Sequence, residues 1–253
     1  MTMNTLTFAD PMYDCTFKLL FAKKENINLT KSLIKNLLLF DDDEIENLDI
    51  LNPENNVWSQ AELKSSVDII CDTTKGKKII IEMQRYNTKY FLSRSQYYMA
   101  NRITDETTIG MHSKYHQIDQ IYLLVIANDI LFNDNRYYRK IRPADKDTNE
   151  EMIDNKMYWV FYEIPKYRMY KEKIDNKNGL TKKIDLKKHK IVNNRFEQWL
   201  SFLATCNYQK EEPENIDDVI KQSYFLMKLS NMEHKARKKY FELVQEELDK
   251  KET

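Results

Sequence analysis

The fold is decided by one stretch of the chain, residues 66–84, which reads SVDIICDTTKGKKIIIEMQ. Its first part, 66–72, has the alternating pattern of a half-buried strand. Its last part, 78–84, reads as a second strand that stays apolar until its end. Lys75-Gly76 between the two is a hairpin turn signal. The stretch therefore predicts an antiparallel β-hairpin.

Three polar residues should meet at the open end of this hairpin. A turn at Lys75-Gly76 places Asp68 opposite Met83, between Glu82 and Gln84. Glu82 and Gln84 share a face because strand residues two apart point the same way, and a one-residue bulge or turn shift brings Asp68 onto that face. Two adjacent carboxylates are tolerated when a divalent cation lies between them, and Mg²⁺ takes few protein carboxylates. The spacing fits such a metal site, and it equally fits two solvated acids at a strand end.

Outside the hairpin, strand and helix signals alternate along the chain. Further strands are expected at 120–127, apolar enough to be buried on both faces, and at 159–164, ended by Pro165. A strand at 57–64 is left open. Helical periodicity is expected from Asp10-Pro11 to 21, at 31–40 with Thr30 as N-cap, and at 91–102, 193–205, 217–229 and 233–251. The acidic run 41–54 is expected to be a loop.

Composition excludes several classes of protein. The three glycines among 253 residues lie too far apart for a dinucleotide-binding fingerprint or a P-loop. The three cysteines, odd in number and widely spaced, predict no disulfide framework or paired-cysteine zinc site, and reduced thiols favour a cytoplasmic location. His112 and His116 lie one helical turn apart but lack a third metal ligand. No signal peptide and no apolar run of membrane-spanning length is visible, so no membrane association is expected.

Lys plus Arg and Asp plus Glu both total 40, but the charges are segregated. Residues 166–190 hold ten bases against three acids, a net charge of +7. A second basic cluster, interleaved with tyrosines, consists of Arg136, Arg139, Lys140 and Arg142. Basic stretches that contain Tyr suit the backbone of a polyanion, so we predict that this cluster binds DNA; a solvated lysine-rich surface is the equally weighted alternative.

Several blocks together resemble the PD-(D/E)XK nuclease superfamily, and more narrowly its recombination-promoting nuclease and transposase branch. The blocks that carry the resemblance are Asp10, Pro11, Asp14, Phe17, Lys18 and Phe21; Lys64; Asp68; Glu82-Met83-Gln84; Phe91, Arg94, Tyr97 and Tyr98; and Gly110 followed by Lys114-Tyr115, offset by one residue. They span residues 10 to about 165.

The resemblance implies a restriction-endonuclease-like α/β (α+β) fold, with a mixed sheet flanked by helices, and Mg²⁺- or Mn²⁺-dependent cleavage of DNA. Asp68 and Glu82 would bind the metal, helped by the Met83 carbonyl. Gln84 stands where the superfamily usually has a catalytic Lys, and a neutral amide can only orient water or phosphate by hydrogen bonds. The supporting residues would be Lys64 or Arg94 as a source of positive charge, Tyr98 one turn along the helix from Arg94, and Asp14 as an extra acid.

Three domain segments and two alternative functions complete the expectations. The segments are a nuclease-like core at 1–165, a basic link at 166–190 and a C-terminal helical region at 191–253. One alternative is a catalytically inactive relative that binds DNA or a protein, and the other is an interaction scaffold built on the C-terminal helices. A homodimer would serve double-strand cleavage, because symmetric dimers are the commonest oligomers, but nothing in the sequence requires one.

Overall fold

A computed structural model describes residues 6–51, 68–106, 115–175 and 194–252. Within these ranges the chain forms one six-stranded sheet and seven α-helices. The strands are β1 (Leu48–Leu51), β2 (Ile69–Thr73), β3 (Lys77–Gln84), β4 (Gln120–Ala127), β5 (Tyr138–Ile141) and β6 (Met157–Glu163). The helices are α1 (Asp14–Phe21), α2 (Ile27–Leu38), α3 (Phe91–Glu106), α4 (Ile164–Asp175), α5 (Asn194–Thr205), α6 (Asp218–Met227) and α7 (His234–Glu252). Short 3₁₀ turns are η2 (Lys24–Asn26), η3 (Asp42–Glu44), η6 (Tyr115–Gln117) and η8 (Cys206–Tyr208).

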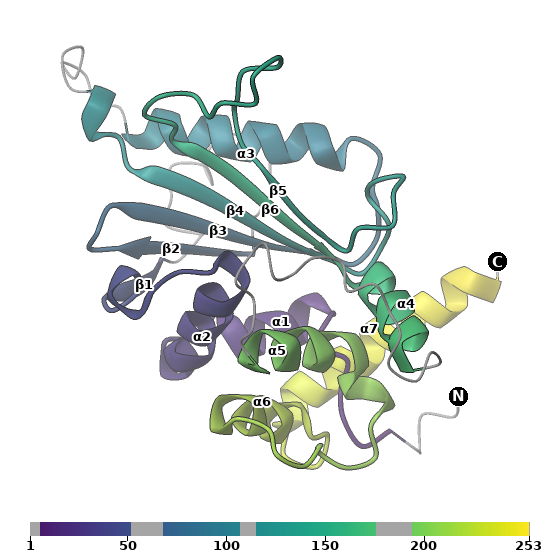
Figure 1. The fold of residues 1–253 in the computed structure, drawn as a ribbon. Helices are drawn as coiled ribbons and strands as arrows, with labels where there is room; N and C mark the ends of the chain where they lie inside the picture. The colour runs from purple at the N-terminus through teal and green to yellow at the C-terminus, as the bar shows by residue number, and fades with distance from the viewer. Residues whose placement is uncertain (1–5, 52–67, 107–114, 176–193, 253) are drawn as a thin grey trace. The chain divides into compact units, whose positions relative to one another are not determined.

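The sheet is mixed, as the resemblance implied. Its strand order is β1-β2-β3-β4-β6-β5 (Figure 1). The three central strands β3, β4 and β6 run parallel, whereas β1, β2 and β5 are antiparallel to their neighbours. Because the central strands are parallel, β3, β4 and β6 end at the same edge of the sheet, where open α/β sheets commonly bind ligands.

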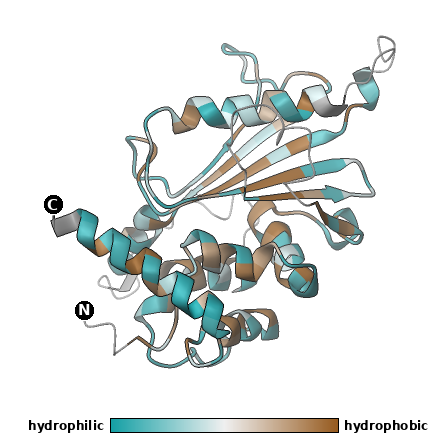
Figure 2. Ribbon diagram, turned by 180° about the vertical axis from the view of Figure 1, so that it is seen from behind, coloured by the Kyte–Doolittle hydropathy of each residue, from teal (hydrophilic) through white to brown (hydrophobic). Residues whose placement is uncertain are grey.

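Helix α3 covers one face of this sheet (Figure 1). Its Phe91, Tyr98 and Met99 pack with Ile70, Ile80 and with alternate residues of β4 in one buried cluster. In Figure 2 the strands are largely brown, in keeping with their apolar sequences. Since side chains alternate along a strand, the even-numbered residues of β2 and β3 face α3. This parity decides which polar side chains of the hairpin can meet.

The hairpin forms as predicted, but its register differs by one residue. Cα partners in β2 and β3 pair Ile69 with Ile81 and Thr73 with Lys77, so opposing residue numbers sum to 150 rather than 151. The turn requires a left-handed residue, and Gly76 has a φ of 68°. The Gly76 N–H donates a hydrogen bond to the Thr73 carbonyl at 3.3 Å.

We expect Gly76→Ala to lower the free energy of unfolding by about 1–2 kcal/mol, the cost of a left-handed conformation in an L-residue. The new Cβ would also lie 2.6 Å from Asp119 Oδ1, so that side chain must move. Urea denaturation measures the change. Thr74→Ala in the same exposed turn is the matched control and should be nearly neutral; equal stability of both variants would contradict the role given to Gly76.

Grouping by contacts divides the chain into two compact units. One contains residues 38–166 with the whole sheet and α3, and the other contains 1–37 together with 167–253. In the second unit the Trp199 indole N–H donates to Ser32 Oγ at 3.0 Å, and Phe21 lies 5.6 Å from the Trp199 ring. The N-terminal helices therefore pack with the C-terminal ones. These compact units do not coincide with the three consecutive segments expected from the sequence.

Several local expectations are corrected. Strand β1 lies inside the acidic run expected to be a loop, and β5 was not anticipated. The first helix begins at Asp14 rather than at Asp10. Helix α2 begins before Thr30, whose hydroxyl donates to the Phe21 carbonyl at 2.8 Å instead of capping. The possible strand at 57–64 lies outside the described residues.

At the end of β6, Pro165 does not end regular structure but occupies the first turn of α4. Proline is favoured there because its missing N–H would be unpaired anyway. The first ten residues of the expected basic link, 166–175, are therefore helical. Among the described helices, none is long and apolar enough to cross a membrane.

Candidate active site

Asp68 and Glu82 lie on one face of the hairpin, at the sheet edge where β3 ends. Extending the β2–β3 register by one residue beyond the Ile69–Ile81 pair brings Asp68 directly opposite Glu82. Cross-strand partners share a face, so both residues are on the α3 side. Of the two routes that we expected, the one-residue turn shift brings them together, and no bulge is needed. Asp68 is 9% exposed and Glu82 is 5% exposed. Two buried carboxyl groups thus stand on adjacent strands.

A hydrogen bond fixes Asp68 to the end of β3. Asp68 Oδ2 accepts from the Met83 backbone N–H at 2.7 Å. In a strand the N–H and C=O of one residue point to the same side, so the Met83 carbonyl is directed toward the β2 side as well. The neighbouring Gln84 carbonyl points the other way and accepts from Asn128 N at 2.8 Å. The backbone pattern therefore places an oxygen of Met83 on the side of Asp68.

A guanidinium from α3 supplies a positive charge beside these acids. Arg94 Nη2 lies 3.7 Å from Glu82 Oε1 and donates to Gln84 Oε1 at 3.1 Å. The Gln84 amide in turn donates to the Tyr86 carbonyl. The Arg94 side chain remains 37% exposed, so it is open to solvent on one side while it contacts two site residues.

Arg94 lies in the first turn of α3, within reach of the site, because the chain turns sharply after β3. Tyr90, just before the helix, has a left-handed φ of 72°, and its carbonyl accepts from Arg94 N at 2.9 Å. The guanidinium carbon lies 5.3 Å from the Phe91 ring and 5.8 Å from the Tyr98 ring. Tyr98 itself is 1% exposed and belongs to the core, where its ring supports Arg94.

Two other predicted site residues, Asp14 and Lys64, remain untested. Asp14 belongs to the helical unit and forms an i,i+4 ion pair with Lys18 at 2.6 Å. Its role as an extra acid stays a prediction. Lys64 lies outside the described residues. Of the two residues expected to supply positive charge, Arg94 is the one that the structure describes, and it lies beside Glu82.

Asp72 lies on the same face of the hairpin as Asp68, but its ion pairs give it a structural role. Its carboxylate pairs with Arg102 at 2.6 Å and with Lys78 at 2.8 Å. Two cations so close leave it charge-balanced within the sheet. Asp72 thus differs from Glu82, whose carboxylate lies 3.7 Å from the half-exposed Arg94 guanidinium.

The residues present fit a hard divalent cation that takes only a few of its ligands from the protein. In the described ranges no group of three or more His, Cys, Asp or Glu residues is placed to hold a metal. Two carboxylates and a carbonyl, all oxygen donors, are nevertheless the set that Mg²⁺ accepts, since it retains several waters or phosphate oxygens. Two carboxyl groups on opposing positions also suit a divalent cation bound between them.

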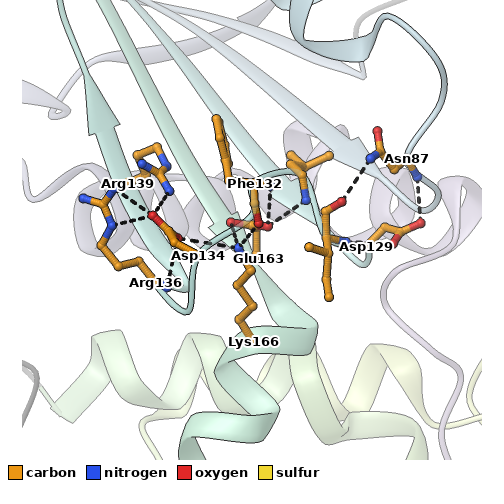
Figure 3. Close-up of polar contacts among 10 residues, drawn as sticks. Asn87, Asp129, Phe132, Asp134, Arg136, Arg139, Glu163 and Lys166 are labelled. Atoms are coloured by element: carbon orange, nitrogen blue, oxygen red, sulfur yellow. Dashed lines mark hydrogen bonds and ion pairs between the residues drawn. The ribbon is translucent and has the colours of Figure 1, made fainter.

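The predicted DNA-binding residues divide into two groups. Arg136 and Arg139 both contact Asp134 Oδ2, at 2.8 and 2.6 Å (Figure 3). Their hydrogen bonds, that of Arg139 above all, hold the pKa of the Asp134 carboxyl well below its ordinary value. The trio keeps one net positive charge, and the Arg136 side chain is 61% exposed.

Lys140 and Arg142 have different partners. Arg139 and Lys140 are consecutive in β5 and point to opposite faces. Lys140 Nζ lies 4.9 Å from the Tyr158 ring, and burial lowers its pKa. Arg142 Nε pairs with Glu151 at 2.6 Å. The four bases therefore do not form one patch, and their binding of DNA stays a prediction.

A buried ion pair that sequence reasoning missed fixes the segment before β5. Glu163 is 1% exposed and pairs with Lys166 at 2.8 Å (Figure 3). Glu163 Oε1 also accepts the backbone N–H groups of Leu131 and Phe132 at 2.7 and 3.2 Å. Lys166, counted above among the basic residues, is thus buried in a structural ion pair. The sequence contained a sign of this pair, because Glu163, like Glu82, is an acid near the end of an apolar strand.

A similar connection holds the segment after β3. The Asn87 backbone N–H donates to Asp129 Oδ2 at 2.8 Å, and its side-chain amide donates to the Ile130 carbonyl at 3.0 Å (Figure 3). The segments that follow β3 and β4 are therefore joined beside Gln84. Together with Glu163 they give the site edge a fixed frame.

Comparison with known proteins agrees with this geometry. No curated protein and no solved structure matches the chain. The family model for PD-(D/E)XK nuclease family transposases matches residues 11–253, a range that includes the hairpin, α3 and the helical unit. With the paired acids of the hairpin and a match over nearly its whole length, the chain belongs to the PD-(D/E)XK nuclease family of transposases.

Proposed function

We propose that this protein is a DNA endonuclease that depends on Mg²⁺ or Mn²⁺. The observation that carries the proposal is the placement of Asp68 opposite Glu82 with Arg94 3.7 Å from the Glu82 carboxylate. Membership of a nuclease-type family supports the same reading. Its three cysteines would stay reduced in the cytoplasm, where we place it.

Asp68, Glu82 and the Met83 carbonyl would hold the cation. When bound, such an ion supplies Lewis acidity toward a phosphodiester and its attacking water. Asp68 is held for this role by the Met83 N–H, which fixes one of its carboxylate oxygens beside the end of β3. Both carboxylates must be ionised to serve as ligands, and the Arg94 guanidinium lies 3.7 Å from Glu82 Oε1.

Arg94 would stabilise charge that develops during phosphodiester hydrolysis. As a water oxygen bonds to phosphorus and the bond to the leaving deoxyribose oxygen breaks, negative charge gathers on the phosphoryl oxygens, and a fixed guanidinium stabilises it. Gln84 is a positioning residue here, because its amide oxygen accepts from Arg94 Nη2 while its amide nitrogen is held by Tyr86. This arrangement offers a substitute for the Lys that the superfamily usually carries at the position of Gln84.

The DNA backbone would contact the Arg136–Arg139 pair. Both arginines follow Leu131 and Phe132, whose backbone groups form hydrogen bonds with Glu163 and Lys166. After the charge of Asp134 is subtracted, the two arginines keep one net positive charge. Fixed arginines bind phosphate more specifically than lysines because their planar fork matches phosphate geometry.

The direct test is nicking of supercoiled plasmid by the purified full chain. We expect conversion to the open-circular form in Mg²⁺ or Mn²⁺, none in EDTA, and recovery when Mg²⁺ is restored in excess. Gel electrophoresis over time measures the rate. Cleavage that continues in EDTA would contradict the proposal, because the two acids would then lack their cation.

A second candidate, a DNA-binding module without catalysis, is favoured by one observation. Gln84 is a neutral amide, and both of its polar ends are already engaged by Arg94 and Tyr86. DNA retardation without cleavage in any divalent metal would support this candidate over the nuclease.

A further inference from the structure

An apolar groove opens on the α3 face of the sheet, beside the candidate active site. Its volume is about 280 Å³, near the lower limit of small-molecule sites, so it accommodates a single ring system rather than a large ligand. One wall consists of Phe132, Trp159 and Phe161, with Ile141 of β5 at its edge. The Phe132 and Phe161 rings meet edge to face at 5.2 Å. The wall is thus a set of aromatic surfaces.

The groove and the catalytic acids belong to one row of residues across the sheet. Glu82 pairs with Val125 of β4, Val125 pairs with Phe161 of β6, and Phe161 pairs with Arg139 of β5. Paired residues share a face, so Glu82 and Phe161 both point toward α3. Two interstrand spacings separate them, about 10 Å between Cα atoms. A group bound in the groove would therefore lie within one nucleotide of a phosphate held at Glu82.

A cation stands beside the groove. The Arg139 guanidinium carbon lies 4.1 Å from the centre of the Phe132 ring, which forms part of the wall. Arg94, which contacts Glu82, belongs to α3, the helix that supplies the opposite wall. Positive charge beside an apolar, aromatic space complements a ligand that combines a planar ring with phosphate groups. A nucleotide within a DNA strand has this composition.

The polar groups at the groove are already used within the protein. Ser95 Oγ and the Gln96 amide both donate to the Leu92 carbonyl, at 2.7 and 3.3 Å. The Trp159 indole N–H donates to the Ser95 carbonyl at 3.3 Å. A ring in the groove would therefore be held by stacking rather than by hydrogen bonds to its edge. Stacking accepts every base, because every base has a π-face.

We propose that this groove receives one unpaired nucleobase next to the phosphodiester that the protein cleaves. A base within a duplex is stacked on both sides and cannot enter, whereas a bulged, mismatched or single-stranded base enters at little cost. The proposal rests on the proposed function and adds to it a substrate class: DNA with a locally unpaired nucleotide, without preference for its identity.

Binding to two labelled duplexes tests this inference. They are identical except that one carries a single unpaired nucleotide, and fluorescence anisotropy in EDTA at low salt gives both dissociation constants without cleavage. We expect the full-length protein to bind the bulged duplex about tenfold more tightly, the effect of one base–aromatic stack. Equal affinities would overturn the proposal. A preference that persists when the bulged nucleotide, whether it carries A, C, G or T, is replaced by an abasic site would also overturn it.

Two variants and a matched control locate the effect. Ile141→Glu places a charge at the groove edge, and Trp159→Leu removes an aromatic wall; both should reduce the preference to less than about twofold. Ile153→Glu adds the same charge at a residue that is 94% exposed and outside the groove, and it should keep the preference. Retention of the preference in both groove variants would overturn the inference.

The outcome separates this inference from the proposed function. Metal-dependent cleavage with equal affinity for both duplexes would refute the groove alone and leave the nuclease in place. Failure to bind either duplex at low salt, where phosphate contacts are strongest, would refute both.

Discussion

Asp68→Asn and Glu82→Gln should each reduce metal-dependent plasmid nicking about 1000-fold. Each change removes one of the two carboxylates that oppose each other just before β2 and near the end of β3. A cation held by one carboxylate and a carbonyl binds weakly, and the several kcal/mol of charge stabilisation that a metal supplies is lost, with about 1.4 kcal/mol for each factor of ten in rate. Initial rates at saturating Mg²⁺ measure the effect.

Asp72→Asn is the matched control for these two variants. Asp72 lies on the same strand and face as Asp68, but its carboxylate pairs with Arg102 and Lys78. Its replacement should lower stability and leave the cleavage rate nearly unchanged below the unfolding temperature. If Asp68→Asn cleaves as fast as Asp72→Asn, a contaminating nuclease accounts for the activity and Asp68 is not a metal ligand.

Arg94→Ala should reduce the turnover number about 100-fold with a much smaller change in DNA affinity. Removal of one fixed donor aimed at developing charge typically has an effect of this size. The Arg94 guanidinium lies within 4 Å of Glu82, and its hydrogen bond to Gln84 fixes its position. Arg94→Lys keeps the charge without the fork and should recover part of the rate. Single-turnover kinetics separate this loss from weaker binding.

The control for Arg94 lies two turns further along the same helix. Arg102 pairs with Asp72, away from the acids, so Arg102→Lys should leave turnover unchanged. An Arg94→Ala variant that retains normal turnover and only binds DNA more weakly would show that Arg94 acts in binding rather than in the chemical step.

The hairpin and its acids were predictable because their signals are local. A turn glycine between two apolar runs fixes the pairing to within one residue, and that one residue decided whether Asp68 needed a bulge to join Glu82. The register could not be read from sequence, because it depends on how Gly76 closes the turn against Asp119. The helix that carries Arg94 was likewise predictable from its hydrophobic periodicity. The contact of Arg94 with Gln84 was not, because it depends on tertiary packing.

Other features were hidden because they arise from long-range contacts. Strand β5 is short and contains two bases, so its sequence resembles a solvated cluster; pairing with β6 makes it a strand. Lys166 reads as the first base of the basic link until Glu163 is placed beside it. The bases of 136–142 are partly neutralised by Asp134 and Glu151, which no local pattern pairs with them.

The three-residue loop of the hairpin also has a consequence for the order of folding. Contacts between residues close in sequence form early because little chain entropy is lost when the loop closes, so β2 and β3 should pair before the parallel strands assemble. Asp68 and Glu82 would then meet while Arg94 is still distant, since α3 must pack on the completed sheet to deliver it. Their mutual repulsion would oppose this early step, and a divalent cation in the refolding buffer should therefore speed the folding of the wild-type chain more than that of Glu82→Gln.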